Sequence, residues 1–246
     1  MPSDNVAAWD QYAAVYEERA RPPTDVVQYG ADIGTEAELR LLGDLTRKRV
    51  LDLGCGAAQN SIAFAKQGAI AIGVDSSAEM LAIARRLCDR EEVRVELRQG
   101  DMADLAFLRA DSIDLAFSSC AFGFVEDLSR VFRQVHRVLR TGAPLVFSMP
   151  HPAYHMIDGD DPEQPPRVRR SYFDRSPIEH ARHGVTFTIH HHTIGDLHTA
   201  LTRASYSVDT ILEPQPSTSG PRSEMWQEAF RYVPRTLVVR ARKLGN

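Results

Sequence analysis

The stretch VLDLGCGAAQNS, Val50 to Ser61, combines residue types that suit nucleotide binding. An apolar run contains Asp52 near its end, and Gly54 and Gly56 follow in a turn before a helical pattern begins. Glycines in such a turn let a ligand approach the backbone closely. The stretch therefore predicts a nucleotide cradle, and the residues around it indicate which nucleotide it holds.

A dinucleotide site is one alternative. Its G-x-G-x-x-G/A pattern needs a small third residue so that the helix packs close to the strand, and here the bulky Gln59 occupies that position. Asp75 closes the next apolar run, about 20 residues after the glycine turn, where an acid binds two ribose hydroxyls. Because every adenosine ligand has this ribose, an NAD-dependent oxidoreductase stays open as a lower-ranked alternative.

The acids of this region favour a cationic ligand. Asp52 lies one residue before the glycine turn, where it repels a pyrophosphate and attracts an ammonium or sulfonium group. No phosphate-binding lysine of the GxxxxGK[ST] kind follows, which disfavours a nucleoside triphosphate. Asp101, in GDMADL after the third apolar run, can accept from an adenine amino group. Asp75 or Asp101 alone would be a turn acid or a helix cap, but acids that close successive strands suit a positively charged adenosine derivative.

These residues need a scaffold that brings them to one edge. From Arg49 to Arg140 the chain repeats a short apolar run, an acid or glycine, and a stretch with helical spacing. This alternation predicts a parallel sheet covered on both faces, with the carboxyl ends of the strands at the edge where open α/β sheets bind ligands. The expected strands are 50–53, 70–74, 93–97, 113–117 and 145–149, and the expected helices are 58–66, 78–89 and 127–139.

A helix is also expected at the front of the chain, over about residues 4–20. Trp9, Tyr12, Ala13 and Tyr16 recur at the spacing of one helical face. This aromatic stripe either docks the helix on the core or makes the helix a lid over a ligand, and the sequence favours neither alternative.

The rhythm of strands and helices breaks after Met149, and residues of about 150–192 form a substrate-side insertion. Order returns with GVTFTIHHH, which alternates like a strand, and with a helix that Thr193 opens through a capping box to Asp196. Strands at 208–212 and 236–241 flank a short amphipathic piece at 226–230. The expected architecture is a three-layer α/β fold, a Rossmann-like seven-stranded sheet that is mostly parallel with an antiparallel last strand, in a single domain 1–246.

Bulk properties favour a small molecule as the partner. The formal net charge is −4, and no run rich in Lys and Arg argues for nucleic acid or a membrane surface. No apolar stretch has the form of a signal peptide or of a membrane span. Three scattered cysteines are too few for a disulfide framework or a zinc site, so we expect a cytoplasmic protein. Lysine occurs only at Lys48, Lys66 and Lys243, a bias that we associate with GC-rich bacterial genomes.

Taken together, the motifs resemble those of a class I S-adenosylmethionine-dependent methyltransferase of the small-molecule, type-11-like family. In order between Val50 and Met149 they read VLDLGCG, GVDSS, GDMADL, SIDLAFSSCAF and HRVLRTGAPLVFSMP. The resemblance implies S-adenosyl-L-methionine as cofactor and S-adenosyl-L-homocysteine as product. Ala58 stands where the family usually has glycine, and one methyl group at a helix start is a tolerable departure.

The resemblance also implies which residues contact the cofactor. Gly54 and Gly56 let the backbone approach the methionine part, and Asp52 helps to hold its amino group. The other implied contacts are Asp75 with the ribose hydroxyls, Ser76 beside it, Asp101 with the adenine amino group, Met80 and Met102 with the ring, the backbone carbonyl of Ser118 with the ammonium, and Tyr16 from the front helix.

Histidines are the candidate catalytic residues, because an imidazole with a pKa near neutrality is the expected general base for a hydroxyl, phenol or protonated amine. His151 directly follows the fifth strand, and His190 to His192 lead into the helix at Thr193 on the same edge. Strand alternation puts His190 and His192 on one side and His191 on the other. The alternatives are a turn cap for His151 and a partly exposed strand end for the others. A metal site is disfavoured because adjacent strand histidines point apart.

The acceptor is expected to be a small molecule. The fourth strand ends in SSCA, which is neither the N-P-P-Y of an exocyclic-amine DNA methylase nor the acidic ligand of a metal-dependent catechol enzyme. Cys120 in this stretch is interpreted as a small buried side chain. Aromatic residues near the same edge suit an apolar or planar acceptor. They are Phe122, Phe124, Tyr154, Tyr172, Phe173, Trp226 and Phe230.

Four arginines of the insertion either bind a carboxylate or form a solvated basic face. They are Arg167, Arg169, Arg170 and Arg175. The predicted function is metal-independent, in-line methyl transfer to an O, N or C atom of a small acceptor, of the kind found in natural product biosynthesis. An S-adenosylmethionine-using enzyme of another type, such as a cyclase, and a non-catalytic binding protein stay open as alternatives.

Overall fold

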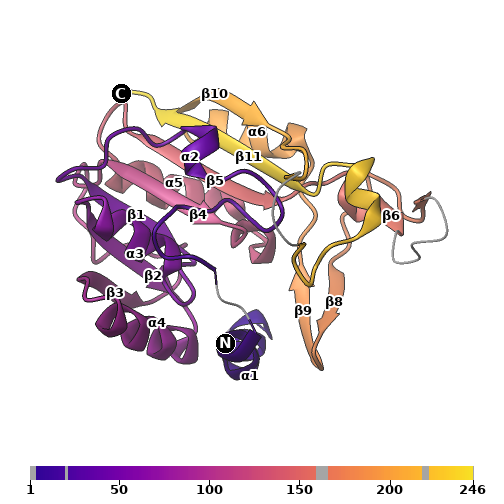
Figure 1. Cartoon of the computed structure of the whole chain (residues 1–246). Coiled ribbons are helices and arrows are strands. Elements are labelled where there is room, and N and C mark those ends of the chain that lie inside the picture. Colours follow the sequence, from indigo (N-terminus) through magenta and orange to yellow (C-terminus); the bar gives the residue numbers. More distant parts are fainter. Residues whose placement is uncertain (1–3, 20–21, 159–165, 218–221, 246) are drawn as a thin grey trace.

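The computed structural model describes residues 4–19, 22–158, 166–217 and 222–245, and its centre is a seven-stranded sheet in the order β10-β11-β5-β4-β1-β2-β3 (Figure 1). Strands β1 to β5 are parallel, and β11 is antiparallel to both of its neighbours, β5 and β10. The predicted mostly parallel sheet with an antiparallel last strand is confirmed. The strands are β1 (Arg49–Leu53), β2 (Ile70–Asp75), β3 (Val95–Gln99), β4 (Leu115–Ser119), β5 (Pro144–Pro150), β10 (Tyr206–Leu212) and β11 (Thr236–Lys243).

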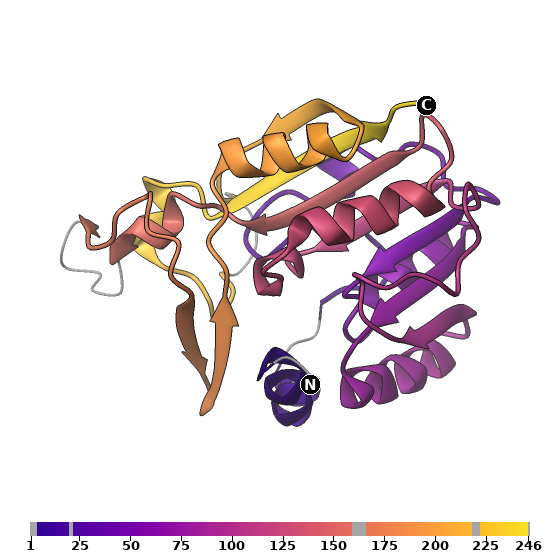
Figure 2. The ribbon, with the colours of Figure 1, turned by 180° about the vertical axis from the view of Figure 1, so that it is seen from behind.

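Helices cover both faces of this sheet and make three layers (Figures 1 and 2). One face carries α5 and α6, and the other carries α3, α4 and the segment of residues 27–45 that contains α2. The bounds are α1 (Asp4–Arg19), α2 (Glu36–Leu39), α3 (Gln59–Lys66), α4 (Ala78–Arg90), α5 (Leu128–Val138) and α6 (Ile194–Arg203). None of the described helices is long and apolar enough to cross a bilayer.

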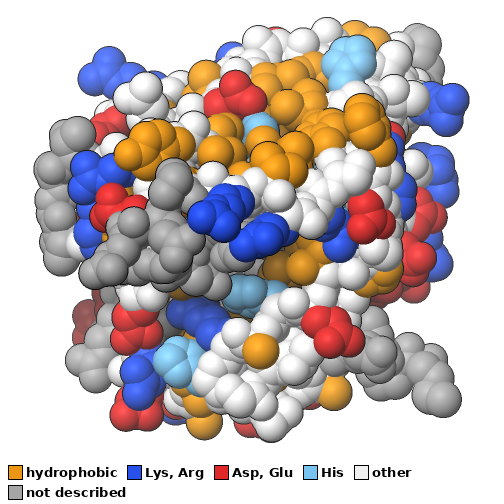
Figure 3. Space-filling model, turned by 90° about the vertical axis from the view of Figure 1, so that its right-hand side faces the viewer, with side chains coloured by type: hydrophobic (Ala, Val, Ile, Leu, Met, Phe, Trp, Pro, Cys, Tyr) orange, Lys and Arg blue, Asp and Glu red, His pale blue; other side chains and the backbone are white. Residues whose placement is uncertain are grey.

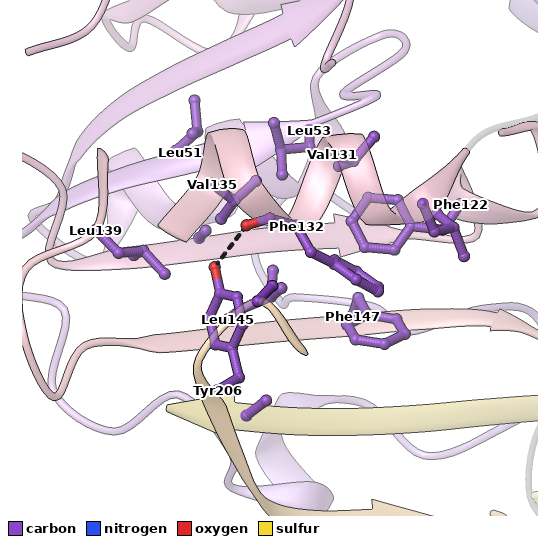
Figure 4. Close-up of a cluster of buried hydrophobic side chains, with 14 of the residues drawn as sticks. Leu51, Leu53, Phe122, Val131, Phe132, Val135, Leu139, Leu145, Phe147 and Tyr206 are labelled. Carbon is purple, nitrogen blue, oxygen red and sulfur yellow. Dashed lines mark hydrogen bonds between the residues drawn. The ribbon is translucent and has the colours of Figure 1, made fainter. Parts of the chain in front are cut away.

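Alternation along the strands builds a core on each face of the sheet. Leu51 and Leu53 of β1 point to the face that α5 covers, whereas Val50 points to the face that Phe64 of α3 covers. Figure 4 shows the first of these cores, in which the rings of Phe132 and Phe147 lie side by side and the Tyr206 hydroxyl donates to the Phe132 carbonyl. Because both faces are buried, the strands are almost continuously apolar.

Two strands begin later than the sequence predicts. β3 starts at Val95 and β4 at Leu115, each two residues after the expected position. In β4 the reason is visible, because Ile113 forms an isolated bridge with Leu139 before the ladder with β1 begins. The shift carries β4 to Ser119 and β3 to Gln99, so the turns that form the ligand edge come directly after these residues.

The segment after β5 contains short hairpins that its composition does not reveal. Strands β6 (Ile157–Asp158) and β7 (Arg167–Val168) pair, and so do β8 (Ile178–Arg182) and β9 (Val185–Ile189). Figure 3 shows hydrophobic side chains gathered on the side of the molecule on which this segment lies. The prediction that the strand continues through the three histidines is wrong, because β9 ends at Ile189, where its pairing with β8 ends.

Helix α1 lies between α4 on one side and the β8–β9 hairpin on the other (Figures 1 and 2). Trp9 and Tyr12 pack against Phe187 of the hairpin, with ring centroids 4.8 and 5.5 Å apart, respectively. Ala13 packs against Met80 of α4. The aromatic stripe therefore docks α1 on the rest of the molecule, and it does so on two sides at once.

Candidate functional site

A cavity of about 1640 Å³ opens at the carboxyl ends of the parallel strands. One part, here called the glycine-turn half, is lined by the turn after β1 and by the ends of β2 and β3. The other part, the hairpin half, is lined by Pro150, Tyr154, His155, Ile178, Ile189 and Trp226. In the sheet, β1 lies between β2 and β4, so the strand order reverses beside β1. The cavity lies at the carboxyl ends of these strands, where open α/β sheets bind ligands.

The turn after β1 is shaped for close approach of a ligand. Gly54 has φ +66°, and a Cβ atom there would lie 2.3 Å from Ala121 Cβ, so only glycine fits. Gly56 has φ +54°, and a Cβ atom there would lie 3.2 Å from Met80 Cε, which is a tight contact. Ala58, directly before α3, has φ +63° although it is not glycine. The chain thus keeps the backbone shape of a glycine turn at a position where a side chain makes that shape more costly.

Asp52 is buried behind this turn at the cavity wall. Ser61 Oγ donates a hydrogen bond of 2.6 Å to its Oδ2. Burial raises the pKa of Asp52 to about 7, and the nearby Asp75 carboxylate acts in the same direction, while the hydrogen bond from Ser61 opposes them. A cation in the cavity would stabilise the ionised form of this buried carboxyl group, because its charge offsets the cost of burying the carboxylate.

Asp75 ends β2 and lies in the same half of the cavity. Its Oδ2 accepts from the Gly56 amide at 2.7 Å and its Oδ1 from the Ser77 amide at 2.9 Å. A carboxylate has about four lone-pair sites, so each oxygen can accept one further bond. Burial raises the pKa of this carboxyl, while the backbone bonds lower it. The group suits a ligand that brings a pair of hydroxyl donors.

Of the other residues expected to contact the cofactor, all but Ser118 line the cavity. Ser76, Met80, Asp101, Met102 and Tyr16 all line it, as do Asp52, Gly54, Gly56 and Asp75. Asp101 is exposed and holds the next turn through a bond from the Ala103 amide. Ser118 is buried, its Oγ donates to the Leu53 carbonyl, and its neighbour Ser119 lines the cavity in its place.

Helix α1 forms part of the cavity wall. The Tyr16 hydroxyl donates a hydrogen bond of 3.2 Å to Gln59 Oε1. Gln59, the bulky residue that departs from the dinucleotide-binding pattern, therefore connects α3 to α1. Burial raises the pKa of Tyr16 to about 12, so the hydroxyl keeps its proton and stays a donor. A second connection, which the sequence does not signal, pairs Asn60 with the backbone of Gln28 in both directions.

The histidines expected to be catalytic, His151 and His190 to His192, do not line the cavity. His151 has both ring nitrogens engaged, since Nε2 lies 2.8 Å from Glu213 Oε1 and Nδ1 accepts from the Ala153 amide. His192 Nε2 contacts the Val125 carbonyl at 2.8 Å. His190 is half-buried and its backbone amide donates to Gly123. His151 thus caps the turn after β5, and His192 fastens the segment before α6.

Three other histidines line the cavity: His155, His180 and His183. His155 belongs to the short 3-10 helix η2 (Tyr154–Met156), and its pKa is lowered to about 4, mainly by burial. The residues around His155 have no periodicity that predicts its position. His180 and Arg182 point to the cavity because alternate residues of β8 share a face with Ile178.

The aromatic residues and arginines expected near an acceptor are only partly at the cavity. Phe124, Tyr154 and Trp226 line it, whereas Phe122 and Phe230 are buried elsewhere and Phe173 is exposed. None of the four insertion arginines lines it. Two of them interact with other residues: Arg170 donates to the Ser176 carbonyl, and Arg175 forms an ion pair with Asp196.

The glycine-turn half fits S-adenosylmethionine. A buried carboxyl with a raised pKa faces the place where the cationic methionine end would lie, and the turn leaves no room for a Cβ atom at Gly54. Asp75 has acceptor capacity for the ribose. Met80 and Met102 supply apolar side chains for the adenine, and Asp101 is within the same lining.

The comparison with protein families matches residues 51–147 to a model described as a methyltransferase domain. A putative methyltransferase of Geobacillus sp. is 30% identical over 123 residues, which is 49% of this chain and 49% of that protein. A magnesium-protoporphyrin O-methyltransferase of Rhodobacter capsulatus is 32% identical over 144 residues, which is 58% of this chain and 62% of that protein. The chain thus aligns with about half of one relative and less than two thirds of the other.

A solved structure resembles the chain over a longer part. It is that of a putative S-adenosylmethionine-dependent methyltransferase from Listeria monocytogenes, with a TM-score of 0.71 and 26% identity over 84% of this chain and 95% of that one. The likeness therefore extends beyond the glycine turn and its neighbouring strands to most of the fold.

Proposed function

Because the chain belongs to the class I S-adenosylmethionine-dependent methyltransferases, we propose that it transfers the methyl group of S-adenosylmethionine to a small apolar or aromatic acceptor in the hairpin half of the cavity. The observation that carries this proposal is the single cavity with two differently lined halves. An in-line displacement needs donor and acceptor side by side in one water-excluding site.

The residues of the chain supply alignment and electrostatics for this reaction. S-adenosylmethionine supplies an activated methyl group when it is bound. Asp52 and Asp75 hold the cationic and ribose parts, and the turn at Gly54 fixes their depth in the cavity. Trp9 and Tyr16 of α1 also line this cavity, so we propose that α1, besides docking on α4 and the β8–β9 hairpin, covers the cofactor. The apolar side chains Ile178 and Ile189 form the wall against which a planar acceptor would lie.

The acceptor class rests on two supports. The Rhodobacter relative is named for methylation of magnesium-protoporphyrin, a small molecule, and the hairpin half offers aromatic and aliphatic side chains together with a few polar groups, as small-molecule sites do. The sequence SSCA at the end of β4 carries no ligand carboxylate, so we propose a metal-independent reaction. By analogy with stand-alone methyltransferases that modify small metabolites, we also propose a role in bacterial specialised metabolism in the cytoplasm.

A pair of glycine variants tests where the cofactor binds. Gly54→Ala places a methyl group against Ala121, whereas Gly43→Ala, at an equally left-handed φ of +71°, meets nothing within 4 Å. We expect Gly43→Ala to bind S-adenosylmethionine like the parent protein in calorimetry, and Gly54→Ala to lose at least tenfold in affinity while its circular dichroism is unchanged. Equal affinities in the two variants would place the cofactor elsewhere.

The nucleoside product separates methyl transfer from the other uses of the fold. Incubation with S-adenosylmethionine and a panel of small aromatic hydroxyl and amino compounds should yield S-adenosylhomocysteine. Methylthioadenosine instead would indicate a cyclisation-type reaction, and binding with no nucleoside product would indicate a non-catalytic protein. Binding of a nicotinamide cofactor in place of S-adenosylmethionine would support the alternative of an NAD-dependent oxidoreductase.

A further inference from the structure

His155 is a histidine of the hairpin half whose hydrogen bonding leaves one nitrogen without a partner. Its Nδ1 lies 3.2 Å from Nδ1 of His191, and its Nε2 is shielded from solvent and has no hydrogen-bond partner within the described ranges. The ring itself is half-buried and lines the cavity. A buried polar atom without a hydrogen-bond partner is costly, so a ligand group that bonds to this nitrogen would be stabilised.

The neighbours of His155 decide which of its nitrogens carries the proton. His191 Nε2 lies 2.9 Å from the Tyr172 carbonyl, which can only accept, so His191 Nε2 must donate. Burial lowers the pKa of His191, so the ring is neutral and its Nδ1 is a lone pair. His155 Nδ1 must then donate to it. The chain from carbonyl to His191 to His155 leaves a lone pair on His155 Nε2.

We propose that His155 Nε2 accepts the hydroxyl hydrogen of the methyl acceptor and takes its proton during transfer, with His191 as the positioning residue. This inference rests on the proposed methyl transfer and narrows the acceptor to a hydroxyl compound. In this structure Nε2 is closed off from solvent although the side chain as a whole is not, so the proposed contact requires a shift of η2.

The step balances in atoms and charge. The bond from the acceptor oxygen to the methyl carbon forms as the bond from that carbon to sulfur breaks, and the electron pair of the broken bond stays on sulfur. The hydroxyl proton moves to His155 Nε2. The positive charge thus passes from the sulfonium to the imidazolium, which releases its proton to solvent after the product leaves.

The surroundings of His155 favour a neutral hydroxyl over an ammonium. Burial is the main cause that lowers its pKa to about 4, and the nearby His191, Arg170, His151 and His192 act in the same direction. The ring is therefore a neutral acceptor throughout the physiological range. A weak base suffices here, because an oxygen that has just gained a methyl group is a far stronger acid than an imidazolium, whereas a protonated amine would have to lose its proton before it could attack.

Nitrogen-detected NMR of the ¹⁵N-histidine-labelled protein with S-adenosylhomocysteine tests the relay, with p-cresol as a hydroxyl probe. We expect His155 to be the Nδ1–H tautomer and p-cresol to shift its Nε2 resonance. His191→Asn, whose amide oxygen can replace the Nδ1 lone pair, should keep this tautomer, and His191→Phe should lose it. An Nε2–H tautomer in the parent protein, or an Nε2 resonance that p-cresol leaves unchanged, would overturn the proposal.

An activity comparison adds a second readout once any hydroxyl substrate is turned over. His155→Gln should lower kcat about 10²-fold or more with little change in the Kd of S-adenosylmethionine. His198→Gln, at an exposed histidine of α6, is the matched control and should keep the parent rate. A parent rate in His155→Gln would contradict the role of His155, whereas failure of the parent protein to bind S-adenosylmethionine would contradict the proposed function itself.

Discussion

Asp52 is the residue whose ionisation depends most directly on the ligand. It is 2% exposed, and its pKa is raised to about 7 mainly by burial. A cationic group in the cavity would favour the carboxylate and bring this pKa down again. Cofactor binding and loss of a proton from Asp52 are therefore linked.

This linkage predicts proton release when the cofactor binds. Near pH 6.5 the cofactor-free carboxyl is largely protonated, so binding of S-adenosylmethionine should release up to one proton, and affinity should rise as the pH rises from 6 to 8. Calorimetry in buffers of different ionisation enthalpy measures the released proton. Asp52→Asn should abolish the release, whereas Asp44→Asn, at an exposed carboxylate, should leave it unchanged. Binding heats of the parent protein that do not depend on the buffer would contradict the linkage.

At the scale of elements, α1 is held in place by one buried amide. Asn5 Oδ1 accepts from the Thr188 amide and its Nδ2 donates to the Thr188 carbonyl, both at 2.8 Å, and Nδ2 also donates to the Phe124 carbonyl at 3.3 Å. These bonds connect α1 to β9 and to the loop after β4. The position of α1 over the cavity depends on them together with the aromatic stripe.

Asn5→Ala should therefore loosen α1 without unfolding the sheet. The loss of these bonds, which leaves backbone groups unpaired, costs about 2 kcal/mol, and amide exchange of residues 5–19 should speed up while exchange in β1 and β4 stays slow. Hydrogen exchange followed by mass spectrometry measures both. Gln11→Ala, at an exposed amide of the same helix, is the control. If α1 exchanges equally in both variants, Asn5 does not hold the helix.

The sequence predicted those elements whose signals are local. Gly54, Gly56 and the acids at the ends of β1 and β2 stand at the cavity because short apolar runs, turn glycines and strand-end acids are adjacent in the chain. Ala58 stands where the resembled family usually has glycine, but its φ is left-handed. The backbone therefore keeps the shape of the turn, and the prediction of the turn holds despite this departure.

The sequence could not predict contacts that depend on distant segments. His151 is bound by Glu213, 62 residues away, and His155 meets His191 only after the insertion folds. The alternation of GVTFTI continues into the triple histidine and predicts a strand there, yet β9 ends at Ile189, opposite Ile178, the first residue of β8. Tertiary pairing, rather than local pattern, decided the position of each of these histidines.

At the scale of the whole molecule, buried histidines make the fold sensitive to acid. Burial lowers the folded-state pKa of each of them below the unfolded value of about 6.5. Their stabilising contribution is present above this value and is lost as the pH falls toward the folded pKa. They are His136, His151, His155, His191 and His192.

The free energy of unfolding should therefore fall by about 2 kcal/mol or more between pH 6.5 and 5. Asp52 and Asp75 oppose this, because burial raises the pKa of each carboxyl and both therefore add stability as the pH falls. Urea denaturation at several pH values measures the slope. His155→Gln should flatten the fall and Asp52→Asn should steepen it. A free energy of unfolding that rises between pH 6.5 and 5 would contradict this prediction.

The central claim is that the two halves of one cavity bring a methyl donor and a small acceptor together. Its most direct test is mass spectrometry of a bacterial metabolite extract after incubation with the protein and S-adenosylmethionine that carries a trideuterated methyl group. The account predicts a small molecule heavier by one trideuterated methyl group, formed together with S-adenosylhomocysteine. Consumption of the cofactor with no label in any small molecule, or with label only in protein or nucleic acid, would contradict it.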